Sequence, residues 1–579
     1  MKNKWITILG ALILGATIFS CKKSFLDRPP ESAFSEVSLA NAKGINATVI
    51  AAYALLDGWS DNGWNNAAGN PWPVSGSNWV WGSVTSDDAY PGSQPNDQPS
   101  VERMNRYEFL PDDPYFRAKF QTCYAGVGKT NVSLRLLNAA TGLSAAEKGQ
   151  LTGEAKFLRA HYHFEAYKMW VNVPYIDENT GDFRVKNDVN IFPKIEQDFK
   201  DAITGLAEVS STSSGRATKG AAQAYLARAY MFIGKYAEAK PLLQAVITSA
   251  KYSLVDNFHD NFDASKQNNT EMLFAYKASV NDGAGESANG NWGDRLNVPH
   301  GNAPVTQCCG FHQPSQNLVN AYKTDAVTGL PFFTTFNAVN YNQATDFVDP
   351  RLDWTAGRTG TPYLDWGPHQ DDWVRDGGYC GYFAPKKNVF HKAQKNTLST
   401  ASGWSAAPNA IDIPFIRYSD VLLMAAECEI ETGGDLNIAR GYINQVRTRA
   451  GKYVQGAGTS EATISQALVG GAGTVNGSKY NVGTYTVAFA GQAAARQAVR
   501  WERRLELAME GYRFFDLRRW NDLQTLIDFL TVEKTRRIQL FGAALVPTTT
   551  KLKYFPLPSV EIDLSKINGA AQLTQNAGY

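Results

Sequence analysis

Apolar residues recur at helical spacing along several stretches of the chain, and two long stretches between them lose that spacing. Residues 35–56 and 115–170 carry apolar side chains roughly three to five positions apart, which is typical of amphipathic helices. Residues 57–114 and 252–415 hold so many Gly, Pro, Asn and Asp residues that regular elements are interrupted. The pattern therefore predicts a mainly α-helical protein with two loop-rich insertions.

The clearest repeat is a helix hairpin at residues 221–247. Its residues stand at tetratricopeptide spacing, in which small side chains let two antiparallel helices pack closely and Gly234 turns the chain. A weaker copy occupies residues 420–446, with Gly433 and Gly434 at the turn. Because the segments between the copies break any fixed period, we expect degenerate tetratricopeptide-like helix pairs within one scaffold, not a free solenoid.

Charged and apolar residues interlock most densely at residues 501–520. As a helix, this segment presents one apolar stripe, made of Trp501, Leu505, Ala508, Met509 and Tyr512. Gly511 is then expected to break or bend the helix. Glu506 lies three residues after Arg503. Glu510 lies three residues before Arg513, so each carboxylate has a basic residue within one helical turn. An acid/base site needs a carboxyl group whose pKa is shifted by burial or by a like charge, so we interpret these charges as structural ion pairs.

Composition places the chain among ordinary globular proteins and excludes one class of partner. Hydrophobic residues make up 44% and charged residues 19% of the 579 residues, which is enough for a large core. Lys and Arg number 56 against 55 Asp and Glu, so the net charge of +1 provides no field that would gather nucleic acid. Nucleic acid is therefore not an expected partner.

The N-terminus has the features of a secretory signal. Lys2 and Lys4 precede a fifteen-residue apolar run that is too short to span a bilayer, and the small Ser20 follows it. The run ending in Ser20 and Cys21 resembles a bacterial lipobox, in which the cysteine is acylated and becomes the first residue of the mature protein. We expect residues 1–20 to be removed as a lipoprotein signal peptide.

The mature chain is expected to begin with a lipidated tether. Residues 21–34 contain lysines and prolines that are unsuited to a helix. Residues 35–579 then form a single domain, and no other apolar run approaches the roughly eighteen residues that a membrane span needs. The lipid on Cys21 would be the only membrane attachment, so we expect a protein anchored to the membrane surface.

The other cysteines indicate neither a disulfide framework nor a metal site. They are odd in number after Cys21 and show no C-x-x-C or Cys/His spacing. The adjacent Cys308 and Cys309 can form a vicinal disulfide or remain as thiols, and the sequence does not choose between these states. No D-x-[DN]-x-[DN]-G calcium loop occurs. We predict no metal and no other cofactor.

The two loop-rich regions have the composition of a carbohydrate site. They contain ten of the fourteen tryptophans of the chain. Indole faces stack on the C–H faces of sugar rings, while Asp and Arg hydrogen-bond hydroxyl groups. The candidate ligand-binding residues are Asp57, Trp64, Trp81, Asp88, Trp292, Arg295, Trp354, Arg358 and Trp366. The alternative for each Trp is that it packs a loop onto the helices.

Short motifs spread over the chain resemble those of the SusD/RagB family of bacterial outer-membrane nutrient-binding lipoproteins. They are the 501–520 run, Phe25-Leu26-Asp27 after Cys21, Asp349-Pro350-Arg351-Leu352, the runs 416–427 and 442–451, and the closing Gln575-Asn576-Ala577-Gly578-Tyr579. They occur in the family's order, and Ala577 stands where the family pattern has proline. The resemblance implies a SusD-like fold built on helix pairs.

The resemblance also implies a role without chemistry. Family members capture oligosaccharides or other nutrients at the cell surface of the outer membrane and form a lid over a TonB-dependent, SusC-like transporter. The matching motifs belong to the scaffold, so the resemblance assigns no binding residue.

Two other classes of protein stay open. A helical-repeat scaffold that binds protein partners or a non-glycan nutrient would also explain the helices. A glycoside hydrolase would show two carboxyl groups about 5 to 10 Å apart, a distance that a sequence cannot show. No G-x-S-x-G or H-E-x-x-H motif occurs. We rank the binding protein first, the scaffold second and the enzyme third.

Overall fold

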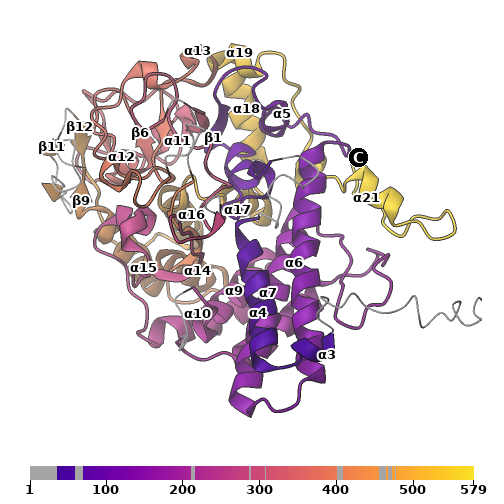
Figure 1. Ribbon diagram of the computed structural model, residues 1–579. Coiled ribbons are helices and arrows are strands. Elements are labelled where there is room, and N and C mark those ends of the chain that lie inside the picture. The colour runs from indigo at the N-terminus through magenta and orange to yellow at the C-terminus, as the bar shows by residue number, and fades with distance from the viewer. Residues whose placement is uncertain are drawn as a thin grey trace, which may run out of the picture.

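Most of the long helices lie on one side of the molecule, and loops with short strands fill the other side, in the computed structural model of the protein (Figure 1). The structure describes residues 36–58, 70–209, 215–285, 288–306, 308–400, 408–455, 465–466, 473–475 and 478–579. The predicted signal peptide, the tether with Cys21, and Trp64 lie outside the described residues. The prediction of a mainly α-helical fold is confirmed.

Several helices begin where the sequence supplies a polar capping residue. The longer ones are α4 (Ala42–Ala54), α5 (Pro99–Arg106), α6 (Pro114–Ala139), α7 (Ala145–Trp170), α8 (Phe192–Gly205), α9 (Lys219–Phe232), α10 (Tyr236–Thr248), α14 (Tyr418–Glu431), α15 (Leu436–Ala450), α16 (Gln492–Leu507), α17 (Arg513–Arg519) and α18 (Gln524–Arg536). The shorter ones are α3 (Glu36–Leu39), α11 (Gln316–Ala321), α12 (Arg351–Thr355), α13 (Gly377–Cys380), α19 (Ile538–Phe541), α20 (Thr549–Lys553) and α21 (Ser559–Leu564). Side chains of Asn41, Asp113, Ser144 and Thr218 accept hydrogen bonds from the first turns of α4, α6, α7 and α9.

The predicted helix hairpins are confirmed. The first is α9 and α10, with Gly234 between them in a left-handed conformation at φ 78° that glycine adopts without strain. The second is α14 and α15, which turn at Gly433 and Gly434. α10 packs against α14, and α8 packs against both α7 and α9. The helix pairs therefore form one continuous scaffold, in which α4, α6 and α7 run side by side (Figure 1).

The predicted break at Gly511 is confirmed, because residues 501–520 form the end of one helix and a second helix, with Gly511 in the turn between them. α16 ends at Leu507, the backbone of Met509 is left-handed at φ 64°, and α17 begins at Arg513. The chain turns here because Gly511 N donates a hydrogen bond to Ser83 Oγ at 3.1 Å, which docks this turn onto the first loop-rich region. The prediction that one helical stripe continues to Tyr512 is therefore wrong beyond Leu507.

The carboxylates of this segment lie in a buried ion-pair network. Glu506 Oε1 is 3.0 Å from Arg417 Nη1 and 2.5 Å from Arg449 Nη2. Glu506 Oε2 is 2.9 Å from Arg351 Nη1, and Glu510 also pairs with Arg417 at 2.9 Å. Burial alone raises the pKa of Glu506, but Arg449, Arg417 and Arg351 lower it well below its ordinary value. The carboxylate stays ionised, which confirms the structural interpretation of these charges.

The partners predicted along the helix are wrong. Arg503 lies 2.6 Å from Asp420, and Arg513 lies 2.8 Å from Asp87, so neither pairs with the glutamates next to it in sequence. α16 packs against α14 and α15, and its side chains meet charges from those helices and from the loops. Long-range packing therefore overrides the local i, i+3 pairing that the sequence suggested.

Short strands connect the loop-rich regions to the scaffold. Among the described residues they pair as β1 (Ala89–Gly92) with β3 (Phe311–Pro314), β2 (Met272–Tyr276) with β8 (Ile413–Arg417), β6 (Ala356–Gly357) with β7 (Ala384–Pro385), β9 (Tyr453–Val454) with β10 (Ser465–Gln466), and β11 (Gly473–Val475), β12 (Ser478–Tyr480), β5 (Phe347–Val348) and β4 (Lys323–Thr324) in that order. β1 and β3 are antiparallel, with Tyr90 opposite Gln313. This pair joins the first loop-rich region to the second.

The loop side has a hydrophobic core of its own. The main core runs through the helices and includes the turn η1 (Leu55–Asp57), η2 (Trp72–Val74) and the π-helix η3 (Trp79–Val84). A second cluster contains Trp354, Tyr363, Trp366 and Trp373 from residues 351–374. The second loop-rich region is therefore packed around its own aromatic residues.

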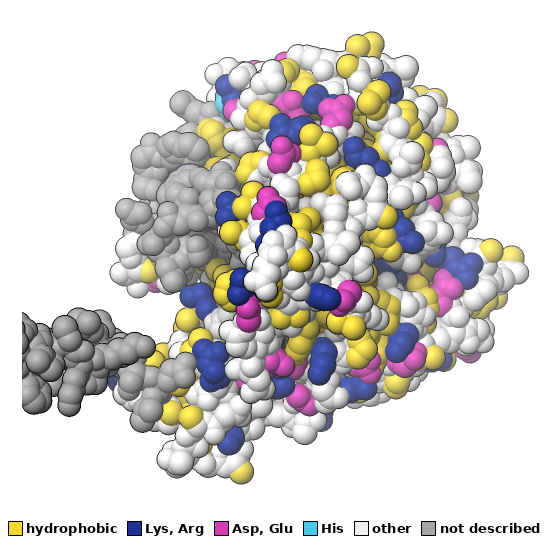
Figure 2. All heavy atoms as spheres, turned by 90° about the vertical axis from the view of Figure 1, so that its right-hand side faces the viewer, with side chains coloured by type: hydrophobic (Ala, Val, Ile, Leu, Met, Phe, Trp, Pro, Cys, Tyr) yellow, Lys and Arg dark blue, Asp and Glu magenta, His cyan; other side chains and the backbone are white. Residues whose placement is uncertain are grey.

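One face of the scaffold carries an apolar depression. Figure 2 looks onto the side with α6 and α21, where hydrophobic side chains lie between basic and acidic ones. The depression has a volume of about 400 Å³, and its walls include Phe120 and Tyr124 of α6 and Leu564 of α21. Phe183 at its edge is 76% exposed. In the part of the chain that the structure describes, no helix has the length and apolar character to cross a membrane.

Candidate ligand-binding site

Three segments that are far apart in the sequence meet where the two loop-rich regions join. The first segment ends with η1, and the second runs from Ser75 into η3. The third segment contains Asn291 to Arg295. The backbone N–H of Gly76 donates to the carbonyl of Asp57 at 3.2 Å. Trp79 Nε1 donates to the carbonyl of Gly293 at 3.1 Å. The site is thus assembled by tertiary contacts, beside the β1–β3 pair.

A buried polar network fixes the third segment. Asp294 accepts hydrogen bonds from Ser75 Oγ at 2.9 Å, Ser77 Oγ at 2.5 Å and Asn291 Nδ2 at 3.2 Å. Burial raises the pKa of Asp294 above its ordinary value, although these hydrogen bonds oppose the shift. A Cβ atom on Gly293 would lie 2.5 Å from Ser75 Cβ, so only glycine permits this approach. The network therefore sets the position of Trp292 and Arg295 on either side of it.

Trp292 and Arg295 form a stacked pair at this site. The guanidinium carbon of Arg295 lies 4.5 Å from the centroid of the Trp292 ring, within cation–π range. Trp292 is partly exposed, whereas Arg295 is 4% exposed. Burial lowers the pKa of Arg295 to about 10, and the side chain stays cationic at neutral pH. An indole ring held by a buried guanidinium is a rigid flat surface of the kind that stacks on sugar rings.

Asp57 is 1% exposed and ends the turn η1. Burial is the main cause that raises the pKa of Tyr276, and the negative charge of Asp57 is the second. The Tyr276 hydroxyl therefore stays protonated. That hydroxyl also donates to the carbonyl of Asn289 at 3.1 Å. Asp57 therefore supports the segment that leads to Trp292.

Trp81 and Asp88 of the first region are enclosed by protein. Trp81 is 0% exposed, donates its indole N–H to Pro73 O at 2.6 Å, and packs its ring 5.1 Å from that of Phe116. Asp88 lies 3.2 Å from Arg504 of α16. In this structure Trp81 has no surface to offer a ligand, and Asp88 serves to dock the loop on α16.

Trp354 and Trp366 belong to the second core, and Arg358 is 2% exposed. Trp354 is 1% exposed and stacks 5.0 Å from His259. Trp366 donates its indole N–H to Phe390 O at 2.8 Å, and Arg358 pairs with Asp353. For these residues the structure shows the packing role that was weighed against ligand contact. Of the candidate residues that the structure describes, Trp292 and Arg295 are in direct contact, and Asp57 is linked to their segment through Tyr276.

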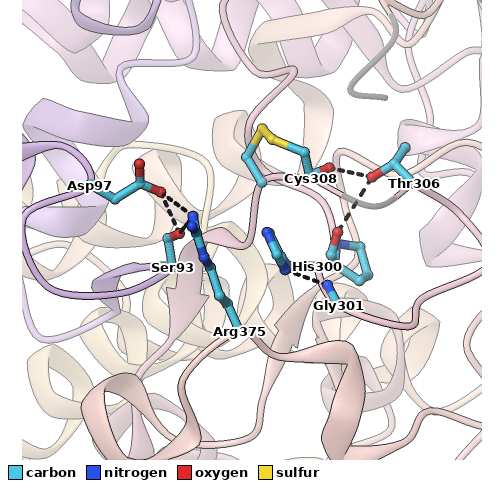
Figure 3. Close-up of a disulfide and its surroundings, with 9 residues drawn as sticks. Ser93, Asp97, His300, Gly301, Thr306, Cys308 and Arg375 are labelled. Carbon is cyan, nitrogen blue, oxygen red and sulfur yellow. Dashed lines mark hydrogen bonds and ion pairs between the residues drawn. A yellow bond between two sulfur atoms is a disulfide. The ribbon is translucent and has the colours of Figure 1, made fainter. Parts of the chain in front are cut away.

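A vicinal disulfide joins Cys308 and Cys309 next to the site. Gly310 N donates to Val298 O at 2.9 Å, which holds the segment after the disulfide against the segment after Arg295. β3 begins at the next residue, Phe311. Figure 3 shows the His300 ring and the Arg375 guanidinium close to it, with Arg375 directed toward Asp97, 2.8 Å away. Of the two states that the sequence left open, thiols or a vicinal disulfide, the structure shows the disulfide.

Sequence reasoning missed the network that positions the site. Ser75, Ser77 and Asp294 are small or acidic loop residues, which occur in any surface loop. Their shared hydrogen bonds span more than two hundred residues of sequence. The Gly293-Asp294 pair directly after a tryptophan was the one available signal, because Gly in a loop often marks a close backbone approach.

The fold and the site define a tetratricopeptide-like helical scaffold that carries a loop-built aromatic and polar surface. The model of the SusD family matches residues 270–579, more than half of the chain, and the chain therefore belongs to this family. A second family model, described as starch-binding and associating with the outer membrane, matches residues 25–231.

Individual relatives agree with this assignment. SusD-like protein P25 of Formosa agariphila is 23% identical over 482 residues, which are 79% of this chain and 78% of that protein. A SusD superfamily protein from Bacteroides vulgatus has a similar structure, with a TM-score of 0.66, 20% identity and coverage of 93% of this chain and 100% of that one. Surface glycan-binding protein A from Bacteroides thetaiotaomicron, in complex with laminarihexaose, gives a TM-score of 0.61, 21% identity, and coverage of 92% and 99%.

Proposed function

We propose that this protein binds an oligosaccharide through the surface formed by Trp292 and Arg295. One observation supports this most directly. Of the four candidate tryptophans that the structure describes, Trp292 alone is partly exposed, and it is stacked on a buried guanidinium. The relative in complex with laminarihexaose shares the fold and binds a glycan. The aromatic ring would stack on a sugar face, and the guanidinium would stiffen it.

The membrane location and the partner belong to the same proposal. Acylation of Cys21 would anchor residues 35–579 to the outer membrane through a short tether and expose them at the cell surface. The SusD family implies delivery of the bound sugar to a TonB-dependent, SusC-like transporter. Stacked helix pairs would offer such a partner a broad and rigid face. Radiolabelled palmitate incorporation into the wild-type chain, and its loss in Cys21→Ala, tests the anchor.

A titration of tryptophan fluorescence with a panel of neutral oligosaccharides tests the binding function. We expect a saturable spectral shift with one glycan class and no shift after Trp292→Ala. Phe183→Ala is the matched control, because Phe183 is an aromatic residue that is 76% exposed and has no proposed ligand contact. No response to any glycan from the folded wild-type protein would leave the scaffold as the better interpretation.

A catalytic role is not proposed. Glu506 and Glu510, the carboxylates first considered for acid/base chemistry, are both held in ion pairs with arginine. Two proteins of similar structure are a laminarin-binding SusD-like protein and a surface glycan-binding protein of Bacteroides thetaiotaomicron. Hydrolysis of the bound oligosaccharide, measured as new reducing ends, would contradict this view.

A further inference from the structure

A second cavity lies on the scaffold, away from the Trp292 site. It has a volume of about 580 Å³ and is bounded by α16, α17, α18 and the segment around Phe333 and Phe336. Small-molecule sites in proteins typically have volumes of about 300 to 1,000 Å³. Its aromatic walls are Phe333, Phe336, Trp501 and Trp520. The Trp501 ring stands edge-on to Phe336 at 4.9 Å, which fixes one side of the cavity.

Four arginines line this cavity, together with Asp87, Asp522 and Asp528, and three of the arginines are neutralised by carboxylates. Arg496 makes two hydrogen bonds to Glu431, at 2.6 and 2.7 Å. Arg504 and Arg513 both pair with Asp87, at 3.0 and 2.8 Å. These arginines are therefore occupied in holding the fold together.

Arg500 is the exception. Among the described residues it has no carboxylate within ion-pair distance and donates no hydrogen bond, and its Nε is buried without an acceptor. The nearby Glu427 is already used, because it makes two hydrogen bonds of 2.7 Å to Arg519. Arg500 is partly exposed and lines the cavity, so an external acceptor can reach the N–H groups other than the buried Nε.

The guanidinium of Arg500 is also held in one orientation. Its central carbon lies 4.7 Å from the centroid of the Trp520 ring, and Trp520 is 9% exposed. Stacking covers one flat face of the guanidinium and leaves its N–H edge for a ligand. Two parallel N–H groups on that edge match the two oxygens of a carboxylate.

We propose that this cavity binds a small ligand through a carboxylate held by Arg500, with the rest of the ligand against Trp501 and Phe336. The carboxylate can belong to a sugar acid or to the C-terminus of a short peptide, since both place the group beside an apolar or C–H-rich surface. The site is separate from the proposed oligosaccharide site and does not depend on it.

Calorimetric titration of the full-length protein in mild detergent tests this proposal. The probes are trigalacturonic acid with its methyl ester, and the tripeptide Ala-Ala-Phe with its C-terminal amide. We expect one of the two acids to bind and its neutral derivative not to bind. The acid that binds shows whether the carboxylate comes from a sugar acid or from a peptide C-terminus. Arg500→Gln is expected to weaken that binding by roughly 10- to 100-fold, as the loss of a charge-assisted hydrogen bond does.

Two controls separate the site from general charge effects. Arg184→Gln removes an equal charge from an exposed ion pair with Asp182 and is expected to leave the affinity unchanged. Trp292→Ala is also expected to leave it unchanged, which separates this cavity from the oligosaccharide site.

Three outcomes would overturn the proposal: no binding of either acid, equal binding of an acid and its neutral counterpart, or full affinity in Arg500→Gln. If Arg500→Gln loses the native circular dichroism spectrum, Arg500→Lys decides instead. That variant keeps the charge but not the paired N–H edge, so we expect a weaker but measurable affinity. Wild-type affinity in Arg500→Lys would contradict the paired geometry.

Discussion

Arg417 and Glu506 are 89 residues apart in sequence, yet Arg417 Nη1 lies 3.0 Å from Glu506 Oε1 in the interior of the scaffold. Arg417 ends β8 directly before α14, and Glu506 lies in the last turn of α16. Both side chains are at most 1% exposed. This pair connects the second loop-rich region to the helices, and its charges are compensated by Arg449, Arg351 and Glu271.

Replacing Glu506 with glutamine is expected to destabilise the protein strongly. The variant keeps the shape of the side chain but leaves three buried arginines short of one negative charge, which costs about 3 to 5 kcal/mol of unfolding free energy. Chemical denaturation followed by circular dichroism measures the effect. Asp182→Asn, in an exposed ion pair, is the control and should leave the denaturation midpoint in place. An equal midpoint for both variants would contradict the role given to the network.

The same kind of pairing predicts an acid-sensitive fold. Burial alone raises the pKa of Asp420, but Arg503 and Arg228 lower it from 3.8 to about 2. Because the folded pKa is below the unfolded one, this stabilisation is fully present above pH 3.8 and is lost as the pH falls toward 2. The denaturation midpoint of the wild type should fall across this window. Asp420→Asn should be less stable at pH 6 and show a shallower acid slope.

How far the sequence predicted this structure depends on the range of the contacts. The hairpins α9–α10 and α14–α15 were predictable because small residues and a glycine turn act within about thirty residues of sequence, the length of one repeat. The partners of Glu506 were not, because Arg351 and Arg417 come from distant segments. Local spacing gives the type of element, whereas ion-pair partners depend on how the elements pack.

The loop tryptophans show a second limit. Trp81, Trp292 and Trp354 all occur in the loop-rich regions, yet Trp292 alone of the three is partly exposed. An indole ring suits a packed core and a sugar-binding surface equally well, so composition does not separate the two uses. The separation requires the tertiary neighbours, such as Phe116 for Trp81 and His259 for Trp354.

This difference gives a direct prediction for Trp354. Trp354→Ala should lower the unfolding free energy by about 3 to 5 kcal/mol, because it removes a large buried side chain from the second core. The oligosaccharide affinity of the molecules that remain folded should not change. Chemical denaturation and calorimetry together measure both quantities. A normal denaturation midpoint with lost affinity would show that Trp354 contacts the ligand instead.

The cysteines provide an independent check of the loop structure. A chain that begins at Lys22 has five cysteines, and the structure joins Cys308 to Cys309 and leaves Cys123, Cys380 and Cys428 as buried thiols. Burial raises the pKa of Cys123 to about 12, so it should not react in the native state. Thiol titration without reductant is expected to find three groups after denaturation and none before it. Five reactive groups would show that the disulfide does not form.

The most direct test of oligosaccharide binding is the affinity of Trp292→Ala and Trp292→Phe for the glycan that the wild type binds, measured by calorimetry. We predict a loss of at least about 30-fold for the alanine variant, as for a central aromatic contact, and a smaller loss for phenylalanine, which keeps a stacking ring. Both variants should keep the wild-type denaturation midpoint within error. Wild-type affinity in a folded Trp292→Ala protein would contradict the proposed site.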